Sequence, residues 1–87
     1  MSRTRAGRFF EEAEGTICYL ACRWEDEHKY EKIADYQSPL DPIAARCGVR
    51  ITRMTERPFG CEFVDGIRKF RLAVVGDEYS YQVIDQN

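Results

Sequence analysis

Apolar and polar residues alternate along the last third of the chain, in three short runs separated by turn signals. The runs are FGCEFV at 59–64, IRKFRLAVV at 67–75 and EYSYQVI at 78–84, with Asp65-Gly66 and Gly76-Asp77 between them. Asp-Gly is favoured in type I′ turns, and glycine at the first central position suits type II′ turns. The pattern therefore predicts an antiparallel meander of three strands joined by two-residue turns.

Two-residue turns set a register for the meander that can be checked across both hairpins. Phe70 is expected opposite both Cys61 and Val83, and Glu62 opposite Lys69. On this register the following apolar residues share one face: Phe59, Cys61, Phe63, Phe70, Leu72, Val74, Tyr79, Tyr81 and Val83. Because a slip by one residue would mix the two faces, we predict that this face packs in the core.

Residues 38–48 carry the signals of a short helix at both ends. Asp41 can cap the N-terminus, Pro42 suits the first helical position, and Gly48 can form a left-handed stop. Residues 49–57 then alternate and are rich in β-branched side chains, which predicts a strand.

The segment 9–36 supports two interpretations. As a helix, it aligns Phe10, Ala13, Ile17, Leu20, Ala21 and Trp24 at intervals of three and four. As a hairpin over 16–36, it places Trp24 opposite Tyr30 across a turn at 25–29, with apolar residues on one face. Gly15 and the run Thr16–Tyr19 are poor helix formers, so we favour the hairpin. A helix over Glu25–Tyr36 is the competing interpretation of the second half.

These elements predict an α+β fold in which an antiparallel sheet packs with one short helix. The sheet would comprise the C-terminal meander and the N-terminal hairpin. We expect residues 1–8 to be a flexible basic arm, because they lack apolar periodicity. Residues 9–87 would form a single α+β domain, since 87 residues support one modest core.

The composition is that of a soluble globular protein, with 44% apolar and 32% charged residues. Its runs of apolar residues fall short of the ~18 that a membrane span needs. The arginine-rich start is followed by Phe9-Phe10 and acidic residues, unlike a secretory signal. We therefore expect a cytoplasmic protein with no membrane contact.

The net charge is unevenly distributed along the chain, from −6 over residues 11–41 to +4 over residues 42–71. Such asymmetry can steer charged partners.

Four cysteines and one histidine are the candidates for metal or nucleophile chemistry. Cys18 and Cys22 have a spacing found in structural zinc sites, but thirteen residues separate Cys47 from Cys61. His28 lies in a charged stretch, and nothing in the pattern pairs it with a thiol. We therefore expect free thiols packed as small apolar side chains, with no metal and no cofactor.

The segment Leu40–Met54 (LDPIAARCGVRITRM) resembles a helix-turn-helix. Ile43-Ala44, Gly48-Val49 and Met54 occupy the small-residue, turn and packing positions of that motif. The resemblance implies a second helix that enters the DNA major groove and an Asp65-Gly66 hairpin that forms the wing of a winged variant.

The helix-turn-helix interpretation would project Arg50, Arg53 and Arg57 from the recognition helix toward phosphates and base edges. Pro58 would end that helix early, and the β-branched residues favour a strand instead. We nominate six basic residues as candidate contacts for a partner or a nucleic acid: Arg46, Arg50, Arg53, Arg57, Lys69 and Arg71.

The sequence carries no phosphate-binding glycine loop and no recognisable pair of catalytic carboxylates. We therefore expect a small intracellular, non-enzymatic protein-binding module that acts as a stoichiometric regulator or inhibitor, of the type that phages and mobile elements encode. This expectation rests on the small size of the chain and on its lack of a recognisable catalytic signature. The alternative is a nucleic-acid-binding regulator that uses the segment 40–57 with a β wing.

Overall fold

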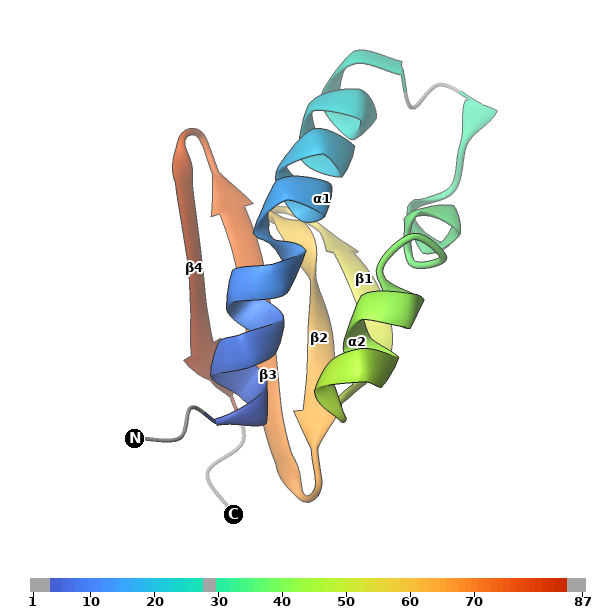
Figure 1. Ribbon diagram of the computed structural model, residues 1–87. Helices are drawn as coiled ribbons and strands as arrows, with labels where there is room; N and C mark the ends of the chain where they lie inside the picture. The colour runs from blue at the N-terminus through green and yellow to red at the C-terminus, as the bar shows by residue number, and fades with distance from the viewer. Residues whose placement is uncertain (1–3, 28–29, 85–87) are drawn as a thin grey trace.

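The computed structural model describes residues 4–27 and 30–84 as a sheet with helices on one face (Figure 1). The helices come first in the chain: α1 (Arg5–Glu27), the 3₁₀ helix η2 (Ile33–Tyr36) and α2 (Asp41–Cys47). Four strands follow: β1 (Arg50–Glu56), β2 (Phe59–Asp65), β3 (Arg68–Val75) and β4 (Glu78–Val83). The strands pair antiparallel in the order β1-β2-β3-β4, so the predicted α+β class with an antiparallel sheet is confirmed.

The predicted N-terminal hairpin over 16–36 is wrong, because α1 runs unbroken from Arg5 to Glu27. Its buried stripe contains Ala6, Phe9, Ala13, Ile17 and Leu20. This stripe repeats at intervals of three and four over fifteen residues, whereas the strand-like alternation covers only Cys18 to Trp24. Burial of the longer stripe against the sheet therefore outweighs the low helix propensity around Gly15.

The neighbouring boundaries also differ from expectation. Residues 5–8, assigned from sequence to the flexible arm, form the first turn of α1, while residues 1–3 lie outside the described part of the chain. The alternative helix over Glu25–Tyr36 is replaced by the end of α1 and by η2. Among residues 4–27 and 30–84, no helix combines the length and the apolar character needed to cross a membrane.

Aromatic contacts fix α1 onto the sheet. Phe9 meets Phe63 of β2 edge to face, with ring centroids 4.8 Å apart. Phe10 stacks on Tyr79 of β4 at 4.4 Å, and the Tyr79 hydroxyl donates a 2.7 Å hydrogen bond to the Phe10 carbonyl oxygen. Burial raises the pKa of the Tyr79 hydroxyl, so this donor keeps its proton. The N-terminal half of α1 is thus held over β2, β3 and β4.

The short helix is confirmed as α2, with a small correction at its start. Asp41 is the first helical residue, and Leu40 takes the N-cap position ahead of it. Gly48 ends the helix in the left-handed conformation, with φ of 79°. The predicted apolar stripe of Ile43, Ala44 and Cys47 is buried.

Residues 50–56 form the strand β1, so the recognition helix implied by the helix-turn-helix resemblance is wrong. The predicted alternation along this strand is also interrupted, because the pairing with β2 shifts between Ile51 and Arg53. Thr52 is the extra residue of this bulge, and its hydroxyl donates to the Glu62 carbonyl oxygen at 3.2 Å. The bulge brings Met54 to the buried face and leaves Arg53 exposed.

The predicted register is confirmed in the second hairpin and corrected in the first. Val83 lies opposite Phe70, as predicted, but the partner of Phe70 on β2 is Phe63 instead of Cys61. The first turn contains Gly66 and Ile67, one residue later than expected, because only the glycine has a positive φ (64°). Glycine first in a two-residue turn is typical of type II′.

The correction moves the pairing by two residues, and the side-chain period of a strand is also two. The predicted apolar face is therefore preserved: Phe59, Cys61, Phe63, Phe70 and Leu72 are all buried. The face becomes more exposed toward β4, where Tyr81 is 37% and Val83 38% exposed. Tyr81 was predicted to be a core residue and lies instead at the border of the core.

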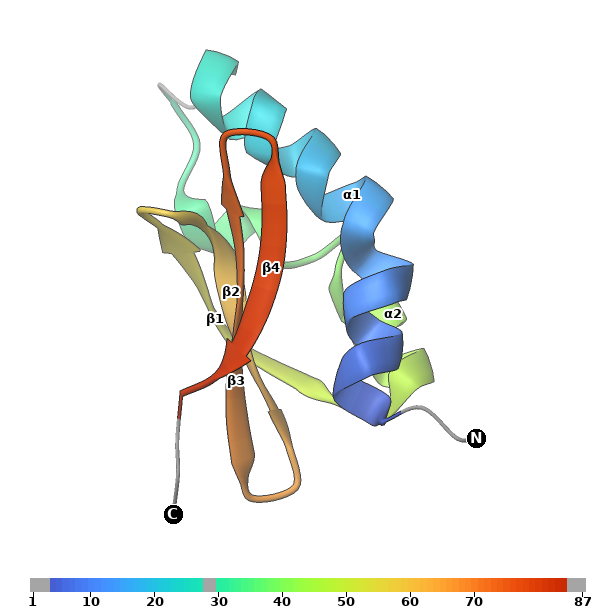
Figure 2. The same ribbon diagram turned by 90° about the vertical axis from the view of Figure 1, so that its left-hand side faces the viewer.

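The other side of the sheet, here called the outer face, is not covered by the helices (Figure 2). At the centre of the outer face, the Glu62 carboxylate accepts 2.7 Å hydrogen bonds from both Arg53 and Arg71. These two hydrogen bonds hold the pKa of the Glu62 carboxyl below its usual range.

We expect Glu62→Gln to lower stability by about 1 kcal/mol at neutral pH. Because the pKa of Glu62 is depressed in the folded protein, its stabilisation is present above the ordinary carboxyl pKa and is lost as pH falls through the depressed value. Melting temperatures of the two proteins should therefore differ at neutral pH and converge in acid. A difference that stays constant down to strongly acidic pH would contradict this assignment.

Candidate functional site

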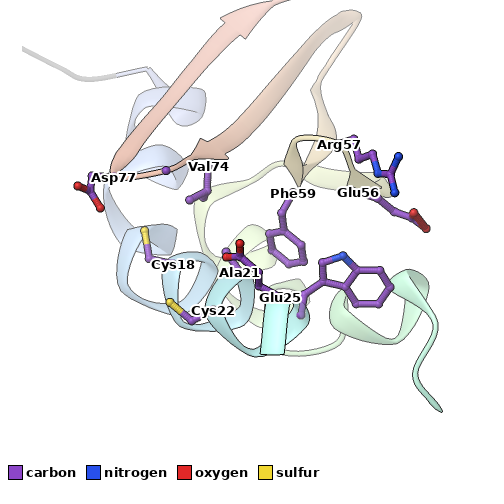
Figure 3. Close-up of a pocket in the computed structure, with 11 residues that line it drawn as sticks. Cys18, Ala21, Cys22, Glu25, Glu56, Arg57, Phe59, Val74 and Asp77 are labelled. Carbon is purple, nitrogen blue, oxygen red and sulfur yellow. The ribbon is translucent and has the colours of Figure 1, made fainter. Parts of the chain in front are cut away.

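A pocket of about 710 Å³ opens between the C-terminal half of α1 and one end of the sheet (Figure 3). Two turns lie at this end of the sheet, the β1–β2 turn and the β3–β4 turn. The pocket is wide enough for a side chain or a small ligand.

One wall of the pocket is the side of α1 next to its buried stripe. Cys18, Ala21, Cys22 and Glu25 recur at intervals of three and four, so they lie along one face of the helix. Trp24 completes this wall and is half-buried. The thiols of Cys18 and Cys22 lie nearer to the β3–β4 turn than to the β1–β2 turn, as Figure 3 shows.

Opposite α1, the inner face of the sheet forms the floor of the pocket with Phe59 and Val74. Phe59 and Val74 point from the sheet toward α1 in Figure 3. Behind them an aromatic series supports the floor: Trp24 meets Tyr36 edge to face at 5.4 Å, and Tyr36 meets Phe59 in the same way at 5.9 Å. These contacts hold the rings in place, so the floor is apolar and preformed.

Charged side chains surround this apolar floor. The acids are Glu25 on α1, Glu56 at the end of β1 and Asp77 in the β3–β4 turn, and all three are exposed. None of them forms an ion pair with a residue that the structure describes, whereas Glu12, Glu31, Glu62 and Asp65 all do. With Arg57 included, the lining carries a formal charge of −2.

The cysteines divide between the pocket and the core. All four are free thiols, and Cys47 and Cys61 are buried while Cys18 and Cys22 reach the pocket. Burial raises the pKa of Cys61 to about 12, and burial followed by the negative charge of Glu14 raises the pKa of Cys18. Both therefore stay protonated near neutral pH, which makes them poor nucleophiles.

No group of three or more His, Cys, Asp or Glu side chains within residues 4–27 and 30–84 is arranged to hold a metal ion. His28, the histidine considered as a ligand, lies outside the described residues.

The structure places the six nominated basic residues in three locations. Arg50, Arg53, Lys69 and Arg71 share the outer face, where Arg50 and Lys69 flank Val64 across neighbouring strands. Arg46 lies on α2 and pairs with Glu12 of α1 at 3.4 Å. Arg57 lies in the β1–β2 turn and lines the pocket. Four of the six candidates thus come together, on strands instead of a recognition helix.

Sequence reasoning missed the pocket because its α1 wall was assigned to a hairpin. One signal was present in the sequence. The helical alternative aligned Ala21 and Trp24 with the core stripe, and Cys18, Cys22 and Glu25 follow the same spacing one position away. Comparisons with protein-family models, curated proteins and solved structures found no match for this chain.

Proposed function

We propose that this protein is a non-enzymatic protein-binding module that acts as a stoichiometric regulator by taking a basic side chain of its partner into the pocket. One observation carries the proposal: an aromatic floor surrounded by three acids that have no ion-pair partner within the described chain. An anchor pocket of this kind can supply most of the affinity of a protein interface.

The chemistry of the pocket favours an arginine or lysine side chain over other occupants. The apolar stem of such a residue can lie against Phe59 and Val74, and its cationic head can lie over the face of Trp24. A cation over an aromatic ring contributes about 0.5–2 kcal/mol, the larger values applying where water is excluded. Glu25, Glu56 and Asp77 would supply charge-assisted hydrogen bonds at the opening.

A selection from short displayed peptides of random sequence tests the proposal. We expect the bound peptides to be enriched in arginine or lysine next to an apolar residue, and to bind with one peptide per protein. Neutralising the opening with Glu25→Gln and Glu56→Gln should weaken binding roughly tenfold, which corresponds to about 1.4 kcal/mol.

The matched control for each single substitution is Glu78→Gln on β4, which also removes one negative charge but from an exposed residue outside the pocket. It should leave peptide binding unchanged. Enrichment of acidic or purely apolar peptides would contradict the proposed chemistry, as would equal losses from the control and the pocket variants.

Nucleic-acid binding is the second candidate function, and one observation favours it. Arg50, Arg53, Lys69 and Arg71 form a basic patch on the outer face, although Glu62 engages Arg53 and Arg71. Such a patch can contact phosphates without reading base sequence.

The test of this second candidate is binding to duplex and single-stranded oligonucleotides as salt is raised. Arg50→Ala with Lys69→Ala removes two cations and leaves the Glu62 hydrogen bonds in place. Affinity that falls steeply with salt and is lost in this variant would support nucleic-acid binding. Binding that the variant retains, or no binding even at low salt, would exclude this face.

A further inference from the structure

We infer that β4 pairs antiparallel with β4 of a second copy of this chain, about a two-fold axis at Tyr81. The resulting homodimer would have one continuous sheet. This inference concerns the free edge of the sheet and is independent of the pocket. In Figure 2 β4 is nearest the viewer, and no described element lies in front of its edge.

The two edge strands, β1 and β4, differ in the features that prevent pairing with another strand. The β1 edge carries a bulge at Thr52, and the side-chain amide of Gln37 donates to the Ile51 carbonyl oxygen at 3.5 Å. Exposed arginines also lie on this strand, at Arg50 and Arg53. Bulges, covering contacts and charged side chains are the devices by which proteins prevent pairing at an edge.

Among its described residues the β4 edge has neither a bulge nor a covering contact, and its single charge, Glu78, lies at the first position of the strand. Its sequence, EYSYQV, contains no lysine, arginine or proline, and its pairing with β3 runs without a bulge from Glu78 to Val83. Tyrosine and valine are strong strand formers. A regular edge of this kind, whose single charge lies at its first residue, is a template for another strand.

Backbone geometry determines which groups face outward from β4. The Ile84 N–H donates to the Lys69 carbonyl oxygen at 2.9 Å, which places the backbone groups of Ile84 toward β3. Because these directions alternate along an antiparallel strand, Gln82 and Ser80 also face β3. The N–H and carbonyl groups of Tyr79, Tyr81 and Val83 therefore point to the free edge.

The sequence of β4 is complementary to itself in the register that these groups allow. With the axis at Tyr81, the two Tyr81 residues exchange both hydrogen bonds, Tyr79 lies opposite Val83, and Ser80 lies opposite Gln82. The apolar members of each pair stay on the helix side, next to Phe10, which already contacts Tyr81 at 4.7 Å. The only charge, Glu78, would face Ile84 instead of another acid.

Two measurements on the full chain test this homodimer. Sedimentation velocity should show the mass doubling as concentration rises. Amide exchange should slow with concentration at Tyr79, Tyr81 and Val83, by roughly tenfold or more, while Ser80 and Gln82 stay protected throughout. A mixed isotope-labelled sample should give a contact between the Hα atoms of Ser80 in one copy and Gln82 in the other.

Tyr81→Lys should abolish the dimer, because it places two like charges opposite each other at the axis. The matched control is Tyr19→Lys, at an exposed tyrosine on α1 that is 64% accessible, and it should leave the mass doubling intact. A chain that stays monomeric with rapid exchange at all three edge amides would overturn the inference. So would a dimer that survives Tyr81→Lys, or β4 protection that appears only with an added extended peptide.

Discussion

Phe63→Ala should lower the free energy of unfolding by about 3–5 kcal/mol, because it removes a fully buried ring from the centre of the core. Phe63 is 0% exposed and lies between two other rings. It meets Phe9 of α1 at 4.8 Å and stacks on Phe70 of β3 at 5.1 Å. Small domains are stable by only about 5–15 kcal/mol in total, so this loss would remove a large share of the stability.

Denaturant titration followed by circular dichroism measures this effect. Tyr19→Ala is the matched control, because it also removes an aromatic ring but from an exposed site on α1. We expect that control to change stability by less than about 0.5 kcal/mol. A similar small effect from Phe63→Ala would show that α1 does not pack on β2 as described.

Gly60→Ala should destabilise the protein by about 3 kcal/mol through a backbone clash. A Cβ atom at Gly60 would overlap the carbonyl oxygen of Leu72 and lie 3.0 Å from the Cα atom of Ala73. Both of those atoms belong to the backbone of β3, so they cannot move away without disturbing the β2–β3 pairing. The close approach of these two strands therefore requires glycine.

Gly15→Ala makes the same chemical change where there is space for it. Nothing lies within 4 Å of a Cβ atom at Gly15, which is an exposed residue in the middle of α1. Alanine is the better helix former, so we expect this variant to be more stable by about 1 kcal/mol. Thermal unfolding of the two variants should move in opposite directions. Two shifts of the same sign would contradict either the helix or the close strand approach.

The C-terminal sheet could be predicted from the sequence because its signals are local. The alternation of apolar and polar residues, together with the glycines at the turns, is enough to identify the strands and their buried face. The position of the first turn was missed by one residue, since Asp65-Gly66 and Gly66-Ile67 are both acceptable turn pairs and only the backbone distinguishes them. The error preserved the buried face because the pairing moved by two residues.

The long helix was missed because its stabilisation is not local. Gly15 and the β-branched residues beside it argue against a helix when propensity alone is considered. The contacts of Phe9 and Phe10 with the sheet, which stabilise α1, cannot be read from the segment itself. The bulge at Thr52 was missed for a related reason, because it depends on pairing with β2.

The candidate pocket depends on both kinds of information and therefore could not be predicted. Its floor uses Phe59 and Val74, whose common face was predicted correctly. Its other wall requires α1 to pass over the end of the sheet. The six basic residues were nominated from their charge and from the helix-turn-helix resemblance. They include the basic cluster on the outer face, but only Arg57 among the residues that line the pocket.

Recognition of a cationic side chain by the pocket is tested most directly by a nuclear magnetic resonance titration with N-acetylarginine methylamide, compared with N-acetylcitrulline methylamide. Citrulline has nearly the same shape as arginine but no charge, so the pair isolates recognition of the cation. We expect the arginine compound to shift the indole N–H of Trp24 and the amides of Cys22 and Asp77, and the citrulline compound to leave them in place. Equal shifts from both compounds, or shifts confined to residues outside the pocket, would contradict this expectation.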